Sequence, residues 1–241
     1  MAVENPKKEF IDTILSFQSH DVWTVFSDFF AVTALEFRCS LSSFEFKRGD
    51  LEQKKAAINQ IYAKYQDKEK ELFPKLYALL EMLIDAEIQN KRFTDIAGGI
   101  FHELDAGNKH TGQFFTPQHL ADLTAGLCLD AEKIRELIAK NGCVRFSEPA
   151  SGAGAMILAW ATAISKCGYN PQKVMFIHAT DIDIRCVNMC YVQLSLYGLP
   201  AVVVHGDTLT LKTWDTMYTP IYYFDWWNLK NERFKEFSRN D

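Results

Sequence analysis

The sequence has no long apolar run, no surplus of basic residues and no paired cysteine pattern. It contains no stretch of about 18 uncharged apolar residues, so nothing is predicted to cross a membrane. The opening MAVENPKKEFIDTIL places acidic residues before its apolar ones and shows no small-residue cleavage site, so a cytoplasmic protein is expected. The 26 basic and 31 acidic side chains give a net charge of −5. An autonomous, tight nucleic-acid binder is therefore not expected, and any such contact needs a local patch or a partner subunit.

The six cysteines are scattered through apolar helix and strand patterns. Reduced cysteine packs in such places as a small hydrophobic residue. Cys186 and Cys190 fall on one face of a predicted helix, but no nearby histidine or second cysteine pair completes a set of metal ligands. We therefore predict structural cysteines and no metal site.

The apolar residues that are present follow two different patterns. Hydrophobic residues make up 48% of the 241 positions, which is enough for a substantial core. Residues 1–108 show only helical periodicity, as in the stripe of Ile58, Ile61 and Tyr65. Residues 109–241 alternate strand and helix patterns. We predict a helical N-terminal domain over 1–108 and an α/β domain over 109–241.

Three strands are predicted in the second part, at residues 143–148, 174–181 and 201–207. Helical patterns separate them, so the connections are expected to be right-handed crossovers in a parallel sheet covered on both faces. Before the first strand, a helix is predicted with Thr116 as its N-cap and Pro117 as its first residue.

The stretch FSEPASGAGAMILAW, residues 146–160, joins the first strand to a helix through a turn of small residues. Gly152 and Gly154 allow the backbone to approach a ligand closely. Ligands of parallel sheets bind beyond the carboxyl ends of the strands. The three predicted strands end in acids, at Glu148, Asp181 and Asp207, so we expect these carboxylates to surround one pocket.

The turn does not suit a dinucleotide. A dinucleotide turn has a third glycine, where this chain has Ile157, and it holds a pyrophosphate that Glu148 would repel. A cationic or zwitterionic nucleoside fits better, and S-adenosylmethionine carries a sulfonium and an amino group but no phosphate. A dinucleotide-dependent oxidoreductase is the disfavoured alternative.

Four motifs in this order, GQFFTP, EPASGAGAMI, ATDID and HGDTL, resemble the cofactor motifs of adenine-N6 DNA methyltransferases. The likeness is strongest to modification subunits of type I restriction systems and their small phage or mobile-element relatives, and it covers about residues 95–220. The resemblance implies a Rossmann-like methyltransferase domain behind a helical N-terminal part, with S-adenosylmethionine as the cofactor. It also implies DNA as a partner, reached through a local patch or through a specificity or modification subunit, and it allows an oligomer.

The resemblance also assigns the cofactor-binding residues. The segment expected to close over the methionine end is Gln113, Phe114, Phe115, Thr116 and Pro117. The amino and carboxyl groups are expected to bind to Glu148 and to the backbone of Ser151, Gly152, Ala153 and Gly154. Asp181 would hold the ribose and Asp207 the adenine amine, with the adjoining Ile182 and Thr208 completing the set. Ser151 departs from the family, since many relatives have cysteine there.

The acceptor motif of the family is degenerate or missing. Relatives carry Asn/Asp-Pro-Pro-Tyr/Phe after the fourth strand, and the nearest match here is Thr219-Pro220-Ile221-Tyr222, followed by Tyr223. These residues are the weak candidates for a catalytic role, and no catalytic residue is assigned.

Three explanations stay open: a methyltransferase with a degenerate acceptor site, an inactive cofactor-binding partner or regulator in a restriction, anti-restriction or mobile-element system, and a piece of a longer enzyme. The aromatic residues around Tyr222 either cap the core or form a base-stacking or docking surface.

Overall fold

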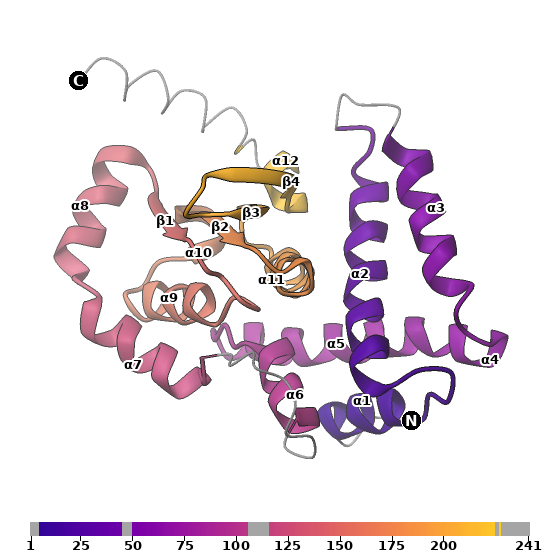
Figure 1. The fold of residues 1–241 in the computed structure, drawn as a ribbon. Coiled ribbons are helices and arrows are strands. Elements are labelled where there is room, and N and C mark those ends of the chain that lie inside the picture. Colours follow the sequence, from indigo (N-terminus) through magenta and orange to yellow (C-terminus); the bar gives the residue numbers. More distant parts are fainter. Residues whose placement is uncertain (1–4, 45–49, 106–115, 225–226, 228–241) are drawn as a thin grey trace.

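The computed structural model describes residues 5–44, 50–105, 116–224 and 227 (Figure 1). The predicted cofactor residues Gln113, Phe114 and Phe115 lie outside the described residues. Within the described part of the chain, no helix is long and apolar enough to cross a membrane.

Every described element before residue 106 is a helix. In chain order these are α1 (Pro6–Leu15), α2 (Val22–Ser40), α3 (Asp50–Tyr62), α4 (Asp67–Lys70), α5 (Leu72–Gln89) and α6 (Ile96–Asp105). Side-chain caps define two of the starts: Asn5 accepts the Lys8 amide of α1, and Asp21 accepts two amides in the first turn of α2.

The second part alternates helices and strands. Its elements are α7 (Gln118–Cys128), α8 (Ala131–Asn141), β1 (Val144–Glu148), α9 (Ala155–Lys166), α10 (Pro171–Val174), β2 (Met175–Asp181), α11 (Ile184–Leu196), β3 (Ala201–Asp207), β4 (Lys212–Tyr218) and α12 (Pro220–Phe224). The three predicted strands form within one residue of the expected bounds. The sheet order is β1-β2-β3-β4, with β1, β2 and β3 parallel as predicted.

The fourth strand was not predicted. β4 pairs antiparallel with β3, through a hairpin in which Leu211 has a left-handed φ of 60°. Threonine, tryptophan and tyrosine are frequent in β4, and this β propensity was the signal available in the sequence. The result is a mixed sheet that is mostly parallel.

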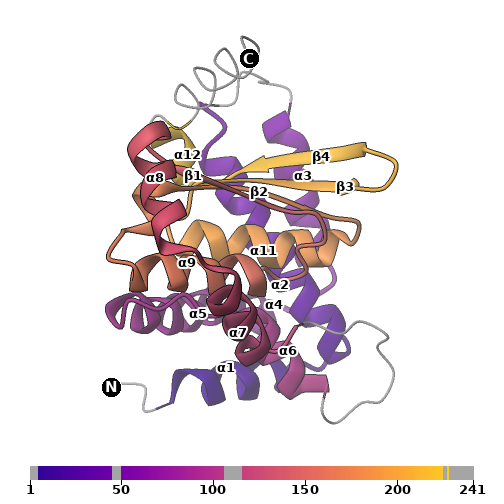
Figure 2. The ribbon, with the colours of Figure 1, turned by 90° about the vertical axis from the view of Figure 1, so that its left-hand side faces the viewer.

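Helices cover the sheet in layers. α9 and α11 pack on one face, and α5 and α1 lie beyond them (Figures 1 and 2). The other face carries a smaller cluster, which consists of Cys143, Phe176, Val202, Val204 and Trp227. Trp227 is 2% exposed and stacks on Phe176 with ring centroids 5.8 Å apart, so this aromatic residue caps the core.

The helical part and the sheet share one hydrophobic core. A single buried cluster runs from Phe10 in α1 to Met217 in β4. An ion pair adds to this contact, because Arg38 of α2 donates to both carboxylate oxygens of Asp215 in β4, at 2.6 and 3.1 Å. Residue 108, the predicted domain boundary, is therefore not a break in the core, and the division into two domains stays a prediction.

Candidate cofactor site at the carboxyl edge of the sheet

The three acidic strand ends lie on one edge of the sheet. Glu148 pairs with Ala179, two residues before Asp181, and Asp181 pairs with His205, two residues before Asp207. Because β1, β2 and β3 are parallel, each acid ends its strand at the same edge, and each strand extends further than the one before it.

Hydrogen bonds connect the loops that follow these strands. The Gly152 amide donates to Asp181 Oδ2 at 2.8 Å, which joins the first loop to the second strand. The Thr208 hydroxyl donates to the Pro149 carbonyl at 2.6 Å, which joins the third loop to the first. His205 Nε2 lies 3.2 Å from the Ile182 carbonyl oxygen and donates to it as the Nε2–H tautomer. All three strand ends therefore belong to one connected site.

The turn after β1 depends on two glycines in left-handed conformations. Gly152 has a φ of 52° and Gly154 a φ of 106°. Gly154 is also the N-cap of α9, and a Cβ there would lie 3.4 Å from the Cys190 sulfur. The Ser151 amide donates to the Thr180 carbonyl at 2.9 Å, which fixes the turn against β2. The chain therefore passes the strand ends with little side-chain bulk in the way.

Asp181 is oriented by two backbone amides. Its Oδ2 accepts from Gly152, and its Oδ1 accepts from Asp183 at 2.9 Å. A carboxylate oxygen has a second lone pair, so each oxygen of Asp181 retains capacity to accept from a ligand.

Glu148 lies half-buried beside this aspartate. The pKa of Glu148 is raised above its usual range. Burial is the main cause and the negative charge of Asp181 adds to it, while the hydrogen bond from the Ala150 amide acts in the opposite direction. Two neighbouring carboxylates, one of them poorly solvated, favour a positively charged group between them.

Ser151 is buried in the same turn. Ser151 is 6% exposed. The Ser151 hydroxyl makes no hydrogen bond of standard geometry with any described residue. Burial raises the pKa of the Cys190 thiol, and the nearby Ser151 hydroxyl lowers that pKa by a smaller amount. Burial likewise raises the pKa of Cys186 to about 12, so both thiols are neutral packing groups.

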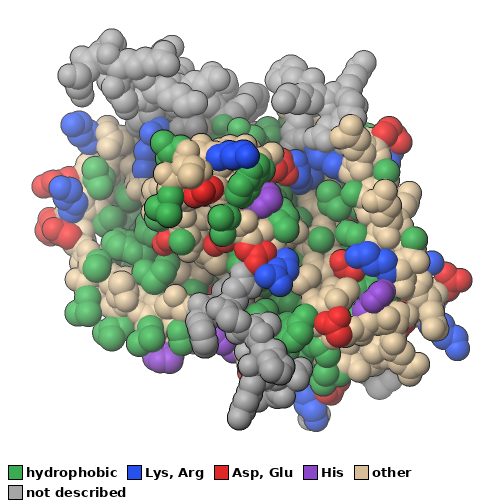
Figure 3. Space-filling model, in the orientation of Figure 1, with side chains coloured by type: hydrophobic (Ala, Val, Ile, Leu, Met, Phe, Trp, Pro, Cys, Tyr) green, Lys and Arg blue, Asp and Glu red, His purple; other side chains and the backbone are tan. Residues whose placement is uncertain are grey.

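Exposed apolar residues follow two of the acids, Asp181 and Asp207, in the chain. Ile182 is 63% exposed, and Leu209 in the hairpin after β3 is 95% exposed. Figure 3 shows hydrophobic and acidic side chains side by side over this hairpin. Asp207 itself accepts the Leu209 amide at 2.9 Å and the Thr210 amide at 3.3 Å. Its bond with the Thr210 side chain, followed by that with the Leu209 amide, lowers its pKa, so Asp207 is an ionised carboxylate at the rim.

Thr116 and Pro117 are exposed, and the predicted cap is wrong by one position. α7 begins at Gln118, and Pro117 occupies the N-cap position without a side-chain cap bond. The extended ψ of 138° at Pro117 places its carbonyl toward the amides of Leu120 and Ala121. Thr116 therefore lies one residue before the N-cap position.

The weak catalytic candidates lie at the opposite end of the sheet. Because β4 runs antiparallel, it carries Thr219 back to the amino end of β3. Thr219 is fully buried, and its hydroxyl donates to the Leu199 carbonyl at 2.8 Å and accepts from the Ala201 amide at 2.9 Å. The structure does not bring Thr219, Pro220, Tyr222 and Tyr223 together with the carboxylates.

Tyr222 and Tyr223 belong to an aromatic group instead. Tyr222 packs on Tyr218 with ring centroids 4.7 Å apart and on Phe176 at 6.1 Å. Tyr223 stacks on Phe44 at 5.8 Å. These contacts agree with a core-capping role, while Phe224 remains 57% exposed.

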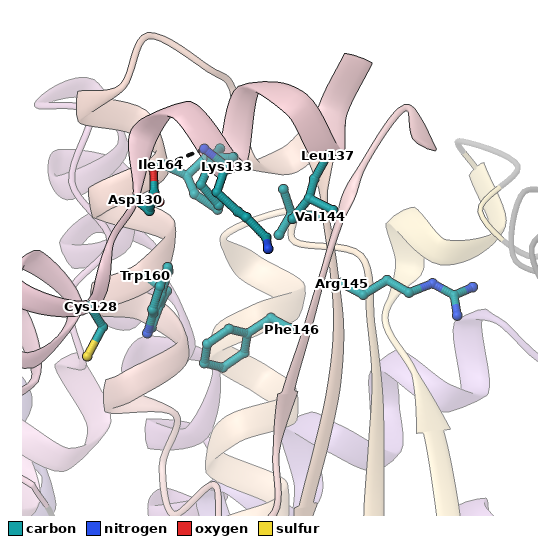
Figure 4. Close-up of a pocket in the computed structure, with 10 residues that line it drawn as sticks. Cys128, Asp130, Lys133, Leu137, Val144, Arg145, Phe146, Trp160 and Ile164 are labelled. Carbon is teal, nitrogen blue, oxygen red and sulfur yellow. Dashed lines mark hydrogen bonds between the residues drawn. The ribbon is translucent and has the colours of Figure 1, made fainter. Parts of the chain in front are cut away.

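A separate cavity of about 240 Å³ lies between α8, β1 and α9 (Figure 4). Phe146 and Trp160 face it, and Arg145 points to the other side of β1. None of the three edge carboxylates lines this cavity. It is therefore distinct from the site at the carboxyl edge.

Gln193 is a residue of the site that sequence analysis missed. It is fully buried in α11, and its Nε2 donates to the Ala153 carbonyl of the glycine turn at 2.8 Å. The available signal was an amide within the apolar helix pattern CYVQLSLY, since a buried amide requires hydrogen-bond partners.

The chain belongs to the N-6 DNA Methylase family, whose sequence profile matches residues 89–238. This confirms the resemblance drawn from the four motifs. The chain is similar to the Type I restriction enzyme MpnII methylase subunit of Mycoplasma pneumoniae, with 23% identity over 113 residues, which are 46% of this chain and 19% of that protein.

Among solved structures, the chain is similar to the type I restriction-modification system methyltransferase subunit from Streptococcus thermophilus. The sequence identity is 13% and the TM-score 0.37, and the match covers 81% of this chain and 55% of the other. The chain thus spans about a fifth of the first relative and about half of the second.

Proposed function

We propose that this chain binds S-adenosylmethionine at the carboxyl edge of its sheet and serves adenine-N6 methylation of DNA. Membership of the N-6 DNA Methylase family supports the class of reaction. The single observation that carries the cofactor assignment is the junction of Glu148, Asp181 and the glycine turn, in which Gly152 donates to Asp181 beside a half-buried Glu148.

The residues present fit a sulfonium nucleoside. The pair of carboxylates suits a ligand with a positive charge and would repel a pyrophosphate. The buried Ser151 hydroxyl has hydrogen-bonding capacity to spare, and Ile182 offers an exposed apolar surface to an aromatic base. Of these features, the carboxylate pair disfavours a dinucleotide, because it would repel the pyrophosphate.

S-adenosylmethionine supplies an electrophilic methyl group when it is bound. In this proposal Glu148 would accept the amino group. The carboxylate would bind to the backbone of residues 151–154 through the Ala153 amide, because the amides of Ser151, Gly152 and Gly154 already donate to Thr180, Asp181 and Ser151. Asp181 accepts both ribose hydroxyls on the lone pairs that its two amide bonds leave free. Asp207 accepts the adenine amine, and Thr208 holds the third loop against Pro149. The contact of residues 113–117 with the methionine end stays a prediction from the family resemblance, since residues 113–115 lie outside the described part of the chain.

Methyl transfer to an adenine amine also needs an acceptor for the amine hydrogens. The Thr219 hydroxyl is already bonded to the backbone of Leu199 and Ala201 at the other end of the sheet. We therefore place the acceptor outside the described residues, in another part of the enzyme or in a partner subunit. With a net charge of −5, the chain alone would bind DNA weakly, so a specificity or modification subunit would bring DNA to the site.

The second candidate is a regulator that binds the cofactor without transferring its methyl group, in a restriction, anti-restriction or mobile-element system. The position of Thr219 favours it, because the hydroxyl of this nearest match to the acceptor motif is bonded to backbone groups at the opposite end of the sheet. Calorimetry with S-adenosylmethionine tests the binding claim. Transfer of labelled methyl groups to unmodified DNA, with and without a modification partner, then separates the enzyme from the regulator. Binding of NAD in place of S-adenosylmethionine would overturn both.

A further inference from the structure

The segment 93–97, which runs into the first turn of α6, is held by three polar side chains from the helices under the sheet. Thr162 of α9 accepts the Phe93 amide at 2.8 Å and donates to the Phe93 carbonyl at 3.0 Å. Tyr197, the C-cap of α11, accepts the Thr94 amide at 3.0 Å and donates to the Thr94 carbonyl at 2.8 Å. Gln193, also of α11, accepts the Ala97 amide at 3.0 Å. The segment is therefore bound to the helices through its backbone.

Gln193 differs from the other two because it also touches the glycine turn. Its Nε2 donates to the Ala153 carbonyl at 2.8 Å and to Asp95 Oδ1 at 2.9 Å. Its Oε1 is the atom that accepts from Ala97. Both N–H groups and the carbonyl of this buried amide thus have partners, and an apolar side chain would leave the Ala153 carbonyl without one.

Asp95 extends this connection to α7. The residue is 5% exposed, and its Oδ1 also accepts the Gly98 amide at 2.7 Å in the first turn of α6. Its own amide donates to Gln118 Oε1 at 2.8 Å. Gln118 is the first residue of α7 and directly follows Thr116 and Pro117. A continuous path of hydrogen bonds therefore runs from the glycine turn through Gln193 and Asp95 to the start of α7.

We infer that Gln193 and Asp95 are positioning residues for the cofactor, which set the glycine turn and the start of α7 at a fixed spacing. Neither needs to touch the ligand. The inference rests on the proposed function, since both connected segments carry predicted cofactor residues. A buried amide such as that of Gln193, with all its partners in place, holds one geometry, because any displacement leaves a polar group unpaired. The turn that presents residues 151–154 to the ligand is then fixed from behind.

The test compares Gln193→Met with Tyr197→Phe. Both changes remove polar atoms that hold segment 93–97, but only the first removes a bond to the glycine turn. We expect both variants to unfold at a lower temperature. We expect only Gln193→Met to lower the affinity for S-adenosylhomocysteine. The expected loss is roughly tenfold, which corresponds to the loss of one buried hydrogen bond. Isothermal titration calorimetry measures the affinity and thermal unfolding measures the stability.

A second ligand separates positioning from general loosening. 5′-Methylthioadenosine has the adenine, ribose and sulfur but no amino acid group, so it does not use the backbone of residues 151–154. Its affinity, followed by NMR titration, should change less than threefold in Gln193→Met (an order-of-magnitude bound for an unaffected site). Equal loss for both ligands would assign Gln193 a structural role only.

Gln118→Leu provides an independent variant if Gln193→Met does not fold. Gln118 is partly exposed, and the change removes its bond to the Asp95 amide. S-adenosylhomocysteine affinity should fall roughly threefold in this variant, the loss expected of a weaker bond near the surface. Unchanged affinity in Gln118→Leu and Gln193→Met, or an equal loss in Tyr197→Phe, would overturn the inference. Failure of the unaltered protein to bind S-adenosylhomocysteine would instead overturn the proposed function.

Discussion

Replacement of Asp181 by alanine is the most informative single change at the carboxyl edge. It removes the bonds from the Gly152 amide at 2.8 Å and from the Asp183 amide at 2.9 Å. Hydrogen bonds to a charged group contribute about 1.5–3 kcal/mol each when they are buried. Both amides lie near the surface and regain water, so we expect a stability loss of only about 1–2 kcal/mol.

The effect on cofactor affinity should be larger. Two ribose hydroxyls would lose their acceptor, at about 1–3 kcal/mol, which weakens binding roughly 5- to 150-fold. Calorimetry with S-adenosylmethionine measures this directly. Thermal unfolding provides a second measurement, because a ligand at 100 times its Kd stabilises the native state by about 2.7 kcal/mol. The ligand-induced rise in unfolding temperature should be smaller in the variant.

Asp183→Ala is the matched control. Asp183 lies two residues further along the chain, caps α11 through the Arg185 amide at 2.9 Å, and pairs with the Arg185 side chain at 2.6 Å. Loss of such a cap should lower stability by about 1 kcal/mol and leave affinity unchanged. If Asp181→Ala binds S-adenosylmethionine as tightly as the unaltered protein does, the assignment of this edge as the cofactor site is refuted.

Three further predictions concern Glu148, the glycine turn and the opposite end of the sheet. The raised pKa of Glu148 means that its contribution to stability is present at acidic pH and is lost as pH rises through that pKa. Glu148→Gln should therefore unfold at a higher temperature than the unaltered protein near neutral pH, yet bind S-adenosylmethionine more weakly by calorimetry; a destabilised variant would contradict the burial argument. Gly154→Ala forces a side chain into a φ of 106°, and chemical denaturation should show a loss of about 1–2 kcal/mol. Thr219→Val leaves the Ala201 amide and the Leu199 carbonyl unpaired, which should cost about 1–3 kcal/mol of stability with no change in cofactor affinity. Weaker cofactor binding in Thr219→Val would be evidence against the separation of the two sheet ends.

The parallel part of the fold could be predicted because its signals are local. Each strand is a short apolar run, and each helix between strands is long enough for a crossover. The glycine turn after β1 and the acid at each strand end are also local features. Given parallel strands, the three acids must share an edge, so their common location follows from the sequence alone.

The predicted location of Thr219 was wrong because the chain reverses direction after β3. Sequence similarity aligned Thr219 with an acceptor motif that follows a strand ending at the cofactor edge. β4 runs the other way, so the same residue caps the opposite end. The Thr116 cap failed for a smaller reason, since the extended backbone of Pro117 shifted the helix start by one residue. Gln193 could not be assigned because its three hydrogen-bond partners are 40, 96 and 98 residues away in the chain.

The core that joins Phe10 to Met217 bears on how this protein can be divided in the laboratory or in evolution. An expression clone that starts at residue 109 would leave α11 without α2 and Asp215 without Arg38. The freshly uncovered apolar surface would promote aggregation, so the sheet and the helices before it have to be transplanted or recombined as a single unit.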